Sequence, residues 1–190
     1  LNTTYKGGTT DGFIAKFDGT GHLVWSTFIG SANNQYVTSV ACDNLGNVVC
    51  SGYGIGYTVP YQQVGNEYYQ IPSNGNLNND AFILKFTSAG NLFWGTSYGG
   101  DGSDLALDLC IDMSNNIFVT GETQSTQVSF PLLFPYDGTH NGQKDMFILK
   151  FDPSGIHKWA TYFGGNGHDI GYGIACDVSG SIYLTGSTLS

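Results

Sequence analysis

The chain has 190 residues, of which 28 are glycine, 14% are aromatic and only 11% are charged. This composition is typical of many short strands joined by tight turns, and it argues against a helical or a disordered protein. The net charge is −9 and no arginine is present, so nucleic acid and anionic membranes are poor electrostatic partners. No apolar run approaches the length of a membrane span, so we expect no membrane insertion.

One pattern occurs three times with constant internal spacing. Each repeat reads Asp-x-Phe-Ile-x-Lys-Phe, then a turn with Gly, a Trp, a second Asp and a final Gly. A core of constant length joined by variable segments indicates a stacked or radial repeat protein. The repeated structural positions are Asp11, Lys16, Trp25, Asp43, Gly52, Asp80, Lys85, Trp94, Asp112, Gly121, Asp145, Lys150, Trp159, Asp177 and Gly186.

The spacing predicts how the chain is organised. Residues 1–10 are the tail of a preceding inter-repeat segment. The first blade repeat with its linker covers 11–79, the second with its linker covers 80–144, and the third covers 145–190. Both ends of the chain fall within inter-repeat segments, so we expect the chain to be cut from a longer protein.

The first hairpin of each repeat begins just after the repeated Asp. In the first repeat Phe13 and Phe17 share one face while Ile14 and Lys16 share the other, and this period of two is typical of a strand. The turn that follows ends in Gly in every repeat, because a short hairpin with a bulge requires a positive φ there. A second strand is predicted over residues 23–29 and the equivalent segments.

A second hairpin completes each repeat. In the first repeat we predict a strand over residues 37–43, a turn that ends at Gly46, and a last strand from Val48 onward. The middle repeat has Asn115 in place of that Gly, and Asn tolerates the left-handed conformation best after Gly. Four antiparallel strands connected as a meander are the plan of a propeller blade.

The predicted fold class follows from this plan. It is all-β, a β-propeller-like array of four-stranded antiparallel blades, with about three blades in this chain. Closed propellers typically have about four to eight blades. We therefore expect the array to be part of a larger or oligomeric assembly, closed either by further blades of a parent chain or by other copies of this chain.

The third repeat carries a resemblance to a known family. The stretch from Asp145 to Phe151, followed by Trp159-Ala-Thr-Tyr-Phe-Gly-Gly and Ile182-Tyr-Leu-Thr-Gly, resembles the bacterial β-propeller repeat called SBBP. The resemblance covers essentially the whole chain in three repeats. It implies a secreted or surface-attached bacterial protein, with no catalytic residues assigned to the repeat.

The carboxylates outside the repeated positions and turns offer no enzymatic site. They are Glu67, Asp101, Asp108, Glu122 and Asp137, and nothing in the sequence pairs them. A glycosidase needs two carboxylates that converge on one bond. We therefore predict that the protein is not an enzyme and has no catalytic residues.

The repeated lysines have two interpretations. They could form a ring of charges along a channel or groove, or each could form a structural pair with a repeated Asp while its stem packs along the sheet. We favour the structural pair for Lys16, Lys85 and Lys150.

The sequence predicts no cofactor and no metal site. The segment Asp101-Gly-Ser-Asp104 could begin a calcium loop, because calcium prefers several oxygen ligands. It lacks the full spacing of such a loop, and Gln35 stands in the first repeat where Asp104 and Asp169 stand in the others. We favour a plain turn.

The four cysteines also allow two interpretations. Cys42 and Cys176 occupy equivalent positions, Cys110 is offset by one residue, and Cys50 lies diagonally across a hairpin from Cys42. Disulfides would suit a secreted protein, but we favour free thiols buried as small apolar residues.

The leading hypothesis is a non-enzymatic, extracellular or cell-surface module that is structural or adhesive and self-assembles into a surface filament through exposed blade edges. One alternative is a carbohydrate-binding propeller that uses the Tyr and Asn residues of the linkers, which makes glycans candidate partners. The other is an accessory domain of a secreted hydrolase. Asn2 begins a lone glycosylation sequon.

Overall fold

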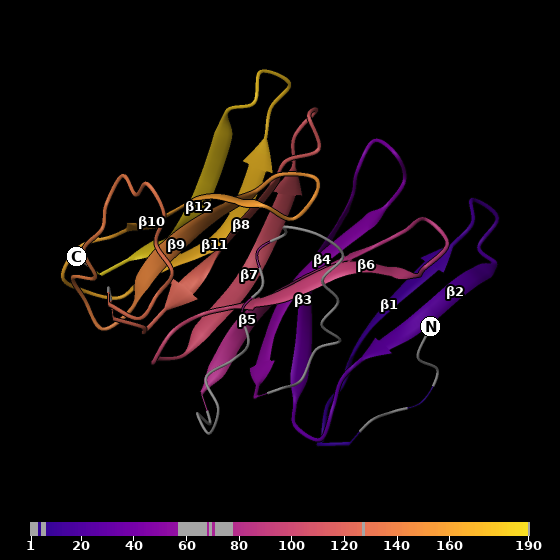
Figure 1. Cartoon of the computed structure of the whole chain (residues 1–190), viewed down its shortest axis with the longest axis horizontal. Coiled ribbons are helices and arrows are strands. Elements are labelled where there is room, and N and C mark those ends of the chain that lie inside the picture. Colours follow the sequence, from indigo (N-terminus) through magenta and orange to yellow (C-terminus); the bar gives the residue numbers. More distant parts are fainter. Residues whose placement is uncertain are drawn as a thin grey trace.

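The structure is a computed structural model that describes residues 4, 7–56, 68, 70, 78–126 and 128–189. These residues form twelve strands and no helix (Figure 1). The strands are β1 (Gly12–Phe17), β2 (Leu23–Ile29), β3 (Gln35–Cys42), β4 (Val48–Ile55), β5 (Asn79–Phe86), β6 (Leu92–Tyr98), β7 (Asp104–Ile111), β8 (Ile117–Thr123), β9 (Asp145–Phe151), β10 (His157–Phe163), β11 (Asp169–Cys176) and β12 (Ile182–Thr188). In this part of the chain no helix exists that could cross a membrane.

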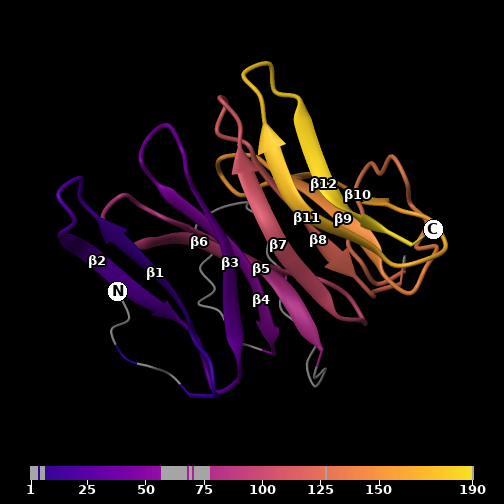
Figure 2. The ribbon, with the colours of Figure 1, turned by 180° about the vertical axis from the view of Figure 1, so that it is seen from behind.

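The strands form four sheets that stand side by side. Two sheets have four strands, in the orders β3-β4-β5-β6 and β10-β9-β8-β7, and two have only the pairs β1-β2 and β11-β12. Strands β3, β7 and β11 lie next to one another, while β1-β2 and β11-β12 stand at opposite ends of the row (Figure 2). All pairings between these strands are antiparallel, and the predicted fold class, an all-β array of propeller-like blades, is confirmed.

The sheets are offset by two strands from the sequence repeats. The first repeat supplies β1 to β4, but β3 and β4 share a sheet with β5 and β6 of the second repeat, in which β4 pairs with β5. The prediction that the four strands of one repeat form one meander is therefore wrong. The periodicity of a strand shows which of its faces is buried, but it does not show which strand lies beside it. The short segment 30–34 joins β2 and β3, which belong to different sheets, whereas the longer segment 56–78 joins β4 and β5, which are paired.

The hairpin turns have the conformations that the sequence predicts. The residue at the end of each turn has a positive φ, and in the middle repeat Asn115 takes the place of Gly with a φ of 62°. The Gly residues at the other five turns are Gly21, Gly46, Gly90, Gly155 and Gly180.

The repeated Gly of the fourth strand has a steric cause. Gly121 of β8 faces a bulge in β7, where the register shifts between Ala106 and Asp108. A Cβ at position 121 would overlap the carbonyl oxygen of Leu105. Gly52 meets the same obstacle, as does the equivalent glycine of β12. Only a residue without a side chain fits opposite the bulge.

Apolar side chains fill the spaces between neighbouring sheets. The largest cluster lies between the two four-stranded sheets and includes the buried Trp94, Tyr98, Phe147 and Phe151. A second cluster around Trp25 joins β1 and β2 to β4 and β5, and a smaller third one joins β11 and β12 to β8 and β9. Each sheet therefore depends on a neighbour for its core, as expected for a repeat array.

Candidate functional site

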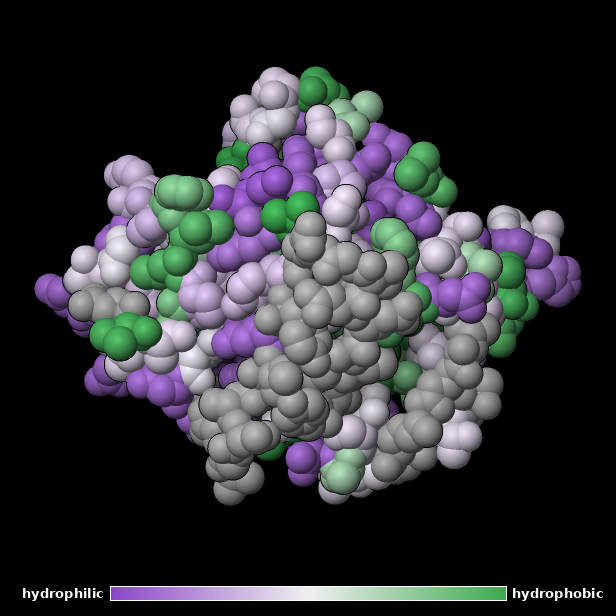
Figure 3. All heavy atoms as spheres, viewed as in Figure 1, coloured by the Kyte–Doolittle hydropathy of each residue, from purple (hydrophilic) through white to green (hydrophobic). Residues whose placement is uncertain are grey.

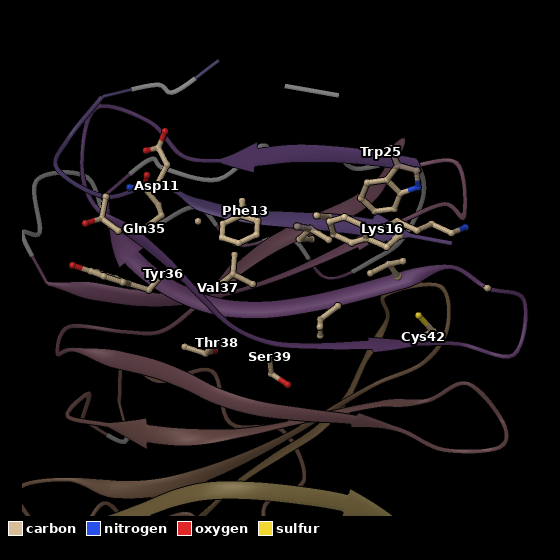
Figure 4. Close-up of a pocket in the computed structure, with 18 residues that line it drawn as sticks. Asp11, Phe13, Lys16, Trp25, Gln35, Tyr36, Val37, Thr38, Ser39 and Cys42 are labelled. Carbon is tan, nitrogen blue, oxygen red and sulfur yellow. The ribbon is translucent and has the colours of Figure 1, made fainter. Parts of the chain in front are cut away.

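A groove of about 1010 Å³ runs between β1 and β3 (Figure 4). Phe13 of β1 lies above Val37 of β3, and Trp25 and Lys16 stand toward one end of the groove while Gln35 stands toward the other. We call this space the open groove. Its walls are mostly apolar strand faces, which favour burial against another protein segment over a small polar substrate.

The open groove exists because β1 pairs on one side only. The equivalent strands β5 and β9 are covered by β4 and β8, so Phe82 and Phe147 are 1% and 0% exposed. Phe13 occupies the same repeated position and is 65% exposed. Among the described residues β1 has β2 as its one paired strand, which leaves the backbone groups of its other edge available for pairing.

At the opposite end of the row, β12 also has a described partner strand on one side only. Strand β12 pairs with β11 and with no other described strand. Its Tyr183 is 60% exposed, whereas Phe118 at the same position of β8 is 3% exposed. The two free edges, of β1 and of β12, are called the open edges from here on.

The outer strand of the β1-β2 pair also presents apolar surface. Leu23 and Val24 of β2 are each more than half exposed. In Figure 3 green spheres lie at this end of the molecule, over the region of β2. The β1-β2 end of the row therefore presents exposed apolar side chains.

The three repeated lysines have three different environments. Lys85 is buried, and its ammonium lies 3.0 Å from the carboxylate of Asp43 and donates to the carbonyl of Pro153 at 3.0 Å. Lys16 donates to the carbonyl of Ser88 at 3.1 Å, and Lys150 lies over the Phe118 ring, 5.0 Å from its centre. The favoured Lys–Asp pairing is therefore present in the middle repeat.

The repeated Asp after the third strand fixes the second hairpin turn. Asp43 accepts hydrogen bonds from the backbone N–H groups of Leu45 and Asn47, both at 2.9 Å. Burial opposes ionisation of Asp43, but hydrogen bonds from Asn47 and Lys85 outweigh burial and lower its pKa. Asp112 and Asp177 accept the same pair of turn N–H bonds in their own repeats.

Two repeated carboxylates lie close together although the sequence analysis did not pair them. Asp80 begins the second repeat and Asp104 begins β7. Their carboxylates lie beside Gly99, so close that both would overlap a Cβ at that position. Burial, and then the charge of Asp104, raise the pKa of Asp80 to about 7. Burial also raises the pKa of Asp104, although Ser125 and the N–H of Gly100 donate to it at 2.7 and 2.8 Å.

Both carboxylates of this pair are buried among the described residues. Within the described part of the chain, the Oδ1 of Asp80 has no hydrogen-bond partner. Two carboxylates in one dry site favour sharing a single proton. The signal that could have located the pair was the recurrence of both positions, since Asp145 and Asp169 occupy the equivalent places in the third repeat.

The singular carboxylates are separated and serve local contacts. Asp108 of β7 accepts from the hydroxyl of Ser39 at 2.7 Å and from the N–H of Ile174 at 2.9 Å, which ties three neighbouring sheets together. Glu122 forms an ion pair with Lys144. Asp137 accepts from the N–H of Thr139. Glu67 lies outside the described residues.

The segment considered for calcium is held by hydrogen bonds within the chain. Hydrogen bonds from Ser129 and from the N–H of Thr126 lower the pKa of Asp101. They fasten the loop before β7 to the segment after β8. Within the described ranges, no three His, Cys, Asp or Glu side chains gather as a set of metal ligands.

One disulfide corrects the prediction that all cysteines are free thiols. Cys110 of β7 is bonded to Cys176 of β11, while Cys42 and Cys50 are free. The offset of one residue, which in the sequence argued against pairing, matches the stagger between the innermost strands of neighbouring sheets. The bond therefore joins two sheets side by side.

The linker residues are only partly described. Tyr68 packs in the core against Tyr98, Phe151 and His157, so it covers a sheet instead of offering a ring to a ligand. Residues 57–67 and the sequon at Asn2 lie outside the described part of the chain.

The family comparison bears on the last three strands. The family model described as SBBP, the β-propeller repeat, matches residues 158–190, which cover β10 except its first residue and all of β11 and β12. Residues 158–190 are thus similar to an SBBP β-propeller repeat. Together with the row of antiparallel sheets, this match makes the protein a repeat protein of the propeller type, and proteins built from such repeats are typically not catalytic.

Two curated proteins are similar to parts of this chain. An "Uncharacterized WD repeat-containing protein L264" of Acanthamoeba polyphaga mimivirus is 26% identical over 65% of the chain. A "Regulatory protein FlaEY" of Caulobacter vibrioides is 25% identical over 58% of the chain. The matched parts span 9% and 12% of these two proteins, so the chain corresponds to about a tenth of each.

Proposed function

We propose that this chain is a non-enzymatic structural or adhesive module of an extracellular or cell-surface bacterial protein, and that it assembles with further repeats into a filament through its open edges. The observation that carries the proposal is the exposure of Phe13 and Tyr183 at positions that are buried elsewhere in the array. Exposed strand edges beside apolar surface favour pairing with another chain.

The disulfide supports the extracellular location. Disulfides form and persist in oxidising compartments and are rare in the cytosol. The bond between Cys110 and Cys176 joins two sheets of the array, so it reinforces the contact by which the module holds its shape.

Light scattering of the purified chain over a range of concentrations tests the assembly. We expect the mass to rise with concentration and electron micrographs to show linear particles. A constant monomer mass together with closed, compact particles would refute the proposal. Secretion and surface labelling of the parent protein test the location.

Carbohydrate binding is the second candidate, and one arrangement favours it. Phe13 and Tyr36 line the open groove and are both exposed, and exposed aromatic faces suit sugar rings. A glycan array tests this candidate. Binding that is blocked by Phe13→Ala would support it, and the absence of any hit would end it.

A further inference from the structure

We propose that the partner of the open groove is a second copy of this chain, whose β11-β12 pair adds to β1 and completes a four-stranded sheet. The inference rests on the proposed function. It adds which strands of the second copy pair with β1 and in which register. Each complete sheet consists of an inner pair from one repeat and an outer pair from the next, such as β3-β4 with β5-β6. Among the described residues, β11-β12 is an inner pair with no outer pair beside it, and β1-β2 is an outer pair with no inner pair beside it.

The register of the new contact follows from the two complete sheets. In both of them the repeated Gly of the inner pair lies opposite the first Phe of the outer pair: Gly52 opposite Phe82, and Gly121 opposite Phe147. Transferred to the open edges, this register places Gly186 of the second copy opposite Phe13. Because strand pairing alternates faces, a slip of one residue would turn these apolar residues to the wrong face.

The charges at the two open edges are complementary in this register. Lys85 binds the carboxylate of Asp43 in the preceding inner pair and the carbonyl of Pro153 in the following sheet. Lys16 already makes the second kind of contact, with the carbonyl of Ser88. The carboxylate that corresponds to Asp43 would come from Asp177 of the second copy.

The open groove has room for the inner strand of the second copy. Strands β3, β7 and β11 lie side by side, and the groove occupies the position beside β3 that a further strand of this row would take (Figures 2 and 4). Burial of Phe13 by the added strand pair then reproduces the environment of Phe82. Each copy offers one edge of each kind, so the contact is head-to-tail and continues into a filament or a ring.

The disulfide between β7 and β11 supplies a test of the contact at single-residue resolution. Cys110 stands two residues before the repeated Asp of its sheet, and Cys176 stands one residue before the Asp of the next sheet. At the proposed contact the same two positions are Ala175 of the second copy and Cys42. Both residues are exposed in the chain alone, so Ala175→Cys leaves the packed core unchanged.

The variant Ala175→Cys is oxidised with oxidised glutathione and analysed by non-reducing gels and by mass spectrometry of peptides. We expect loss of the monomer band, a ladder of linked species, and a peptide that joins position 175 to Cys42. The ladder should vanish when Cys42→Ser is added. Thr139→Cys is the matched control, because it places an exposed thiol on the segment between β8 and β9, and it should leave the monomer band intact.

The outcomes separate this inference from the proposed function. If the unmodified chain assembles in light scattering but position 175 does not link to Cys42, the inferred partner and register are wrong while the structural module stands. If the chain stays monomeric and no link forms, both fall. Equal linking of the Thr139→Cys control would also overturn the inference, because it would show collisions without a specific contact.

Discussion

Replacing the buried lysine of the middle repeat tests whether the repeated lysines are structural. Lys85→Met keeps an unbranched stem of similar length but removes the ammonium that lies between Asp43 and the Pro153 carbonyl. Removing one partner of a buried ion pair typically costs about 3–5 kcal/mol, because the other charge stays buried without compensation. Here the hairpin turn still donates hydrogen bonds to Asp43, so we expect a loss of about 2–3 kcal/mol in the free energy of unfolding.

The assay is urea unfolding followed by tryptophan fluorescence at pH 7. Lys16→Met is the matched control, because it changes the same repeated position where the ammonium is partly exposed and bonds only the carbonyl of Ser88. The control should cost less than about 1 kcal/mol. If both variants lose the same stability, the reasoning from burial and pairing is refuted.

The pH dependence gives the same prediction a second readout. The folded protein lowers the pKa of Asp43, so its ionised form stabilises the fold above the ordinary value of 3.8 and this contribution is lost as the pH falls below it. The difference between the original chain and Lys85→Met should therefore shrink in acid. A difference that is constant from neutral to acidic pH would contradict the assignment of Asp43 as the partner.

Three further changes test other contacts, each by unfolding titration. Burial raises the pKa of Asp80 from 3.8 to about 7, so the fold prefers the neutral form and loses stability as the pH rises from 3.8 to about 7. Asp80→Asn should therefore stabilise the protein at pH 8 by at most about 4 kcal/mol, and no gain would argue against the raised pKa. The double change of Cys110 and Cys176 to Ser should lower the free energy of unfolding by about 2–4 kcal/mol, because the bond closes a loop with a sequence separation of 66, and an unchanged stability would mean that the bond is absent. Gly121→Ala should cost about 3 kcal/mol by overlap with the opposing strand. Gly19→Ala, in open space, should stay within about 0.5 kcal/mol, and equal costs would refute the steric argument.

Local structure could be predicted well from this sequence because its determinants are local. The positive φ of Asn115 follows from its place at a turn where the other repeats have Gly. The strand that begins before Phe13 follows from the alternation of its side chains. Turn chemistry and strand periodicity are set within a few residues, so one repeat is enough to read them.

Contacts between repeats were harder to predict, because they depend on how neighbouring sheets are staggered. The bond between Cys110 and Cys176 needs an offset of one residue, which a comparison of equivalent positions counts as a mismatch. The proximity of Asp80 and Asp104 likewise depends on a turn that brings two strand starts together. Recurrence marks the positions of Asp80 and Asp104 as candidates for a pair, but it does not show that the two side chains meet.

The two-strand offset between repeat and sheet has a consequence for how such an array bears a load. Every complete sheet contains strands from two successive repeats, so no repeat boundary coincides with a gap between sheets. A pull that separates β4 from β5 must break a full ladder of strand pairing, and not merely a side-chain contact between finished units. The array therefore resists separation at each repeat boundary through strand pairing, and the disulfide adds a covalent link between two neighbouring sheets.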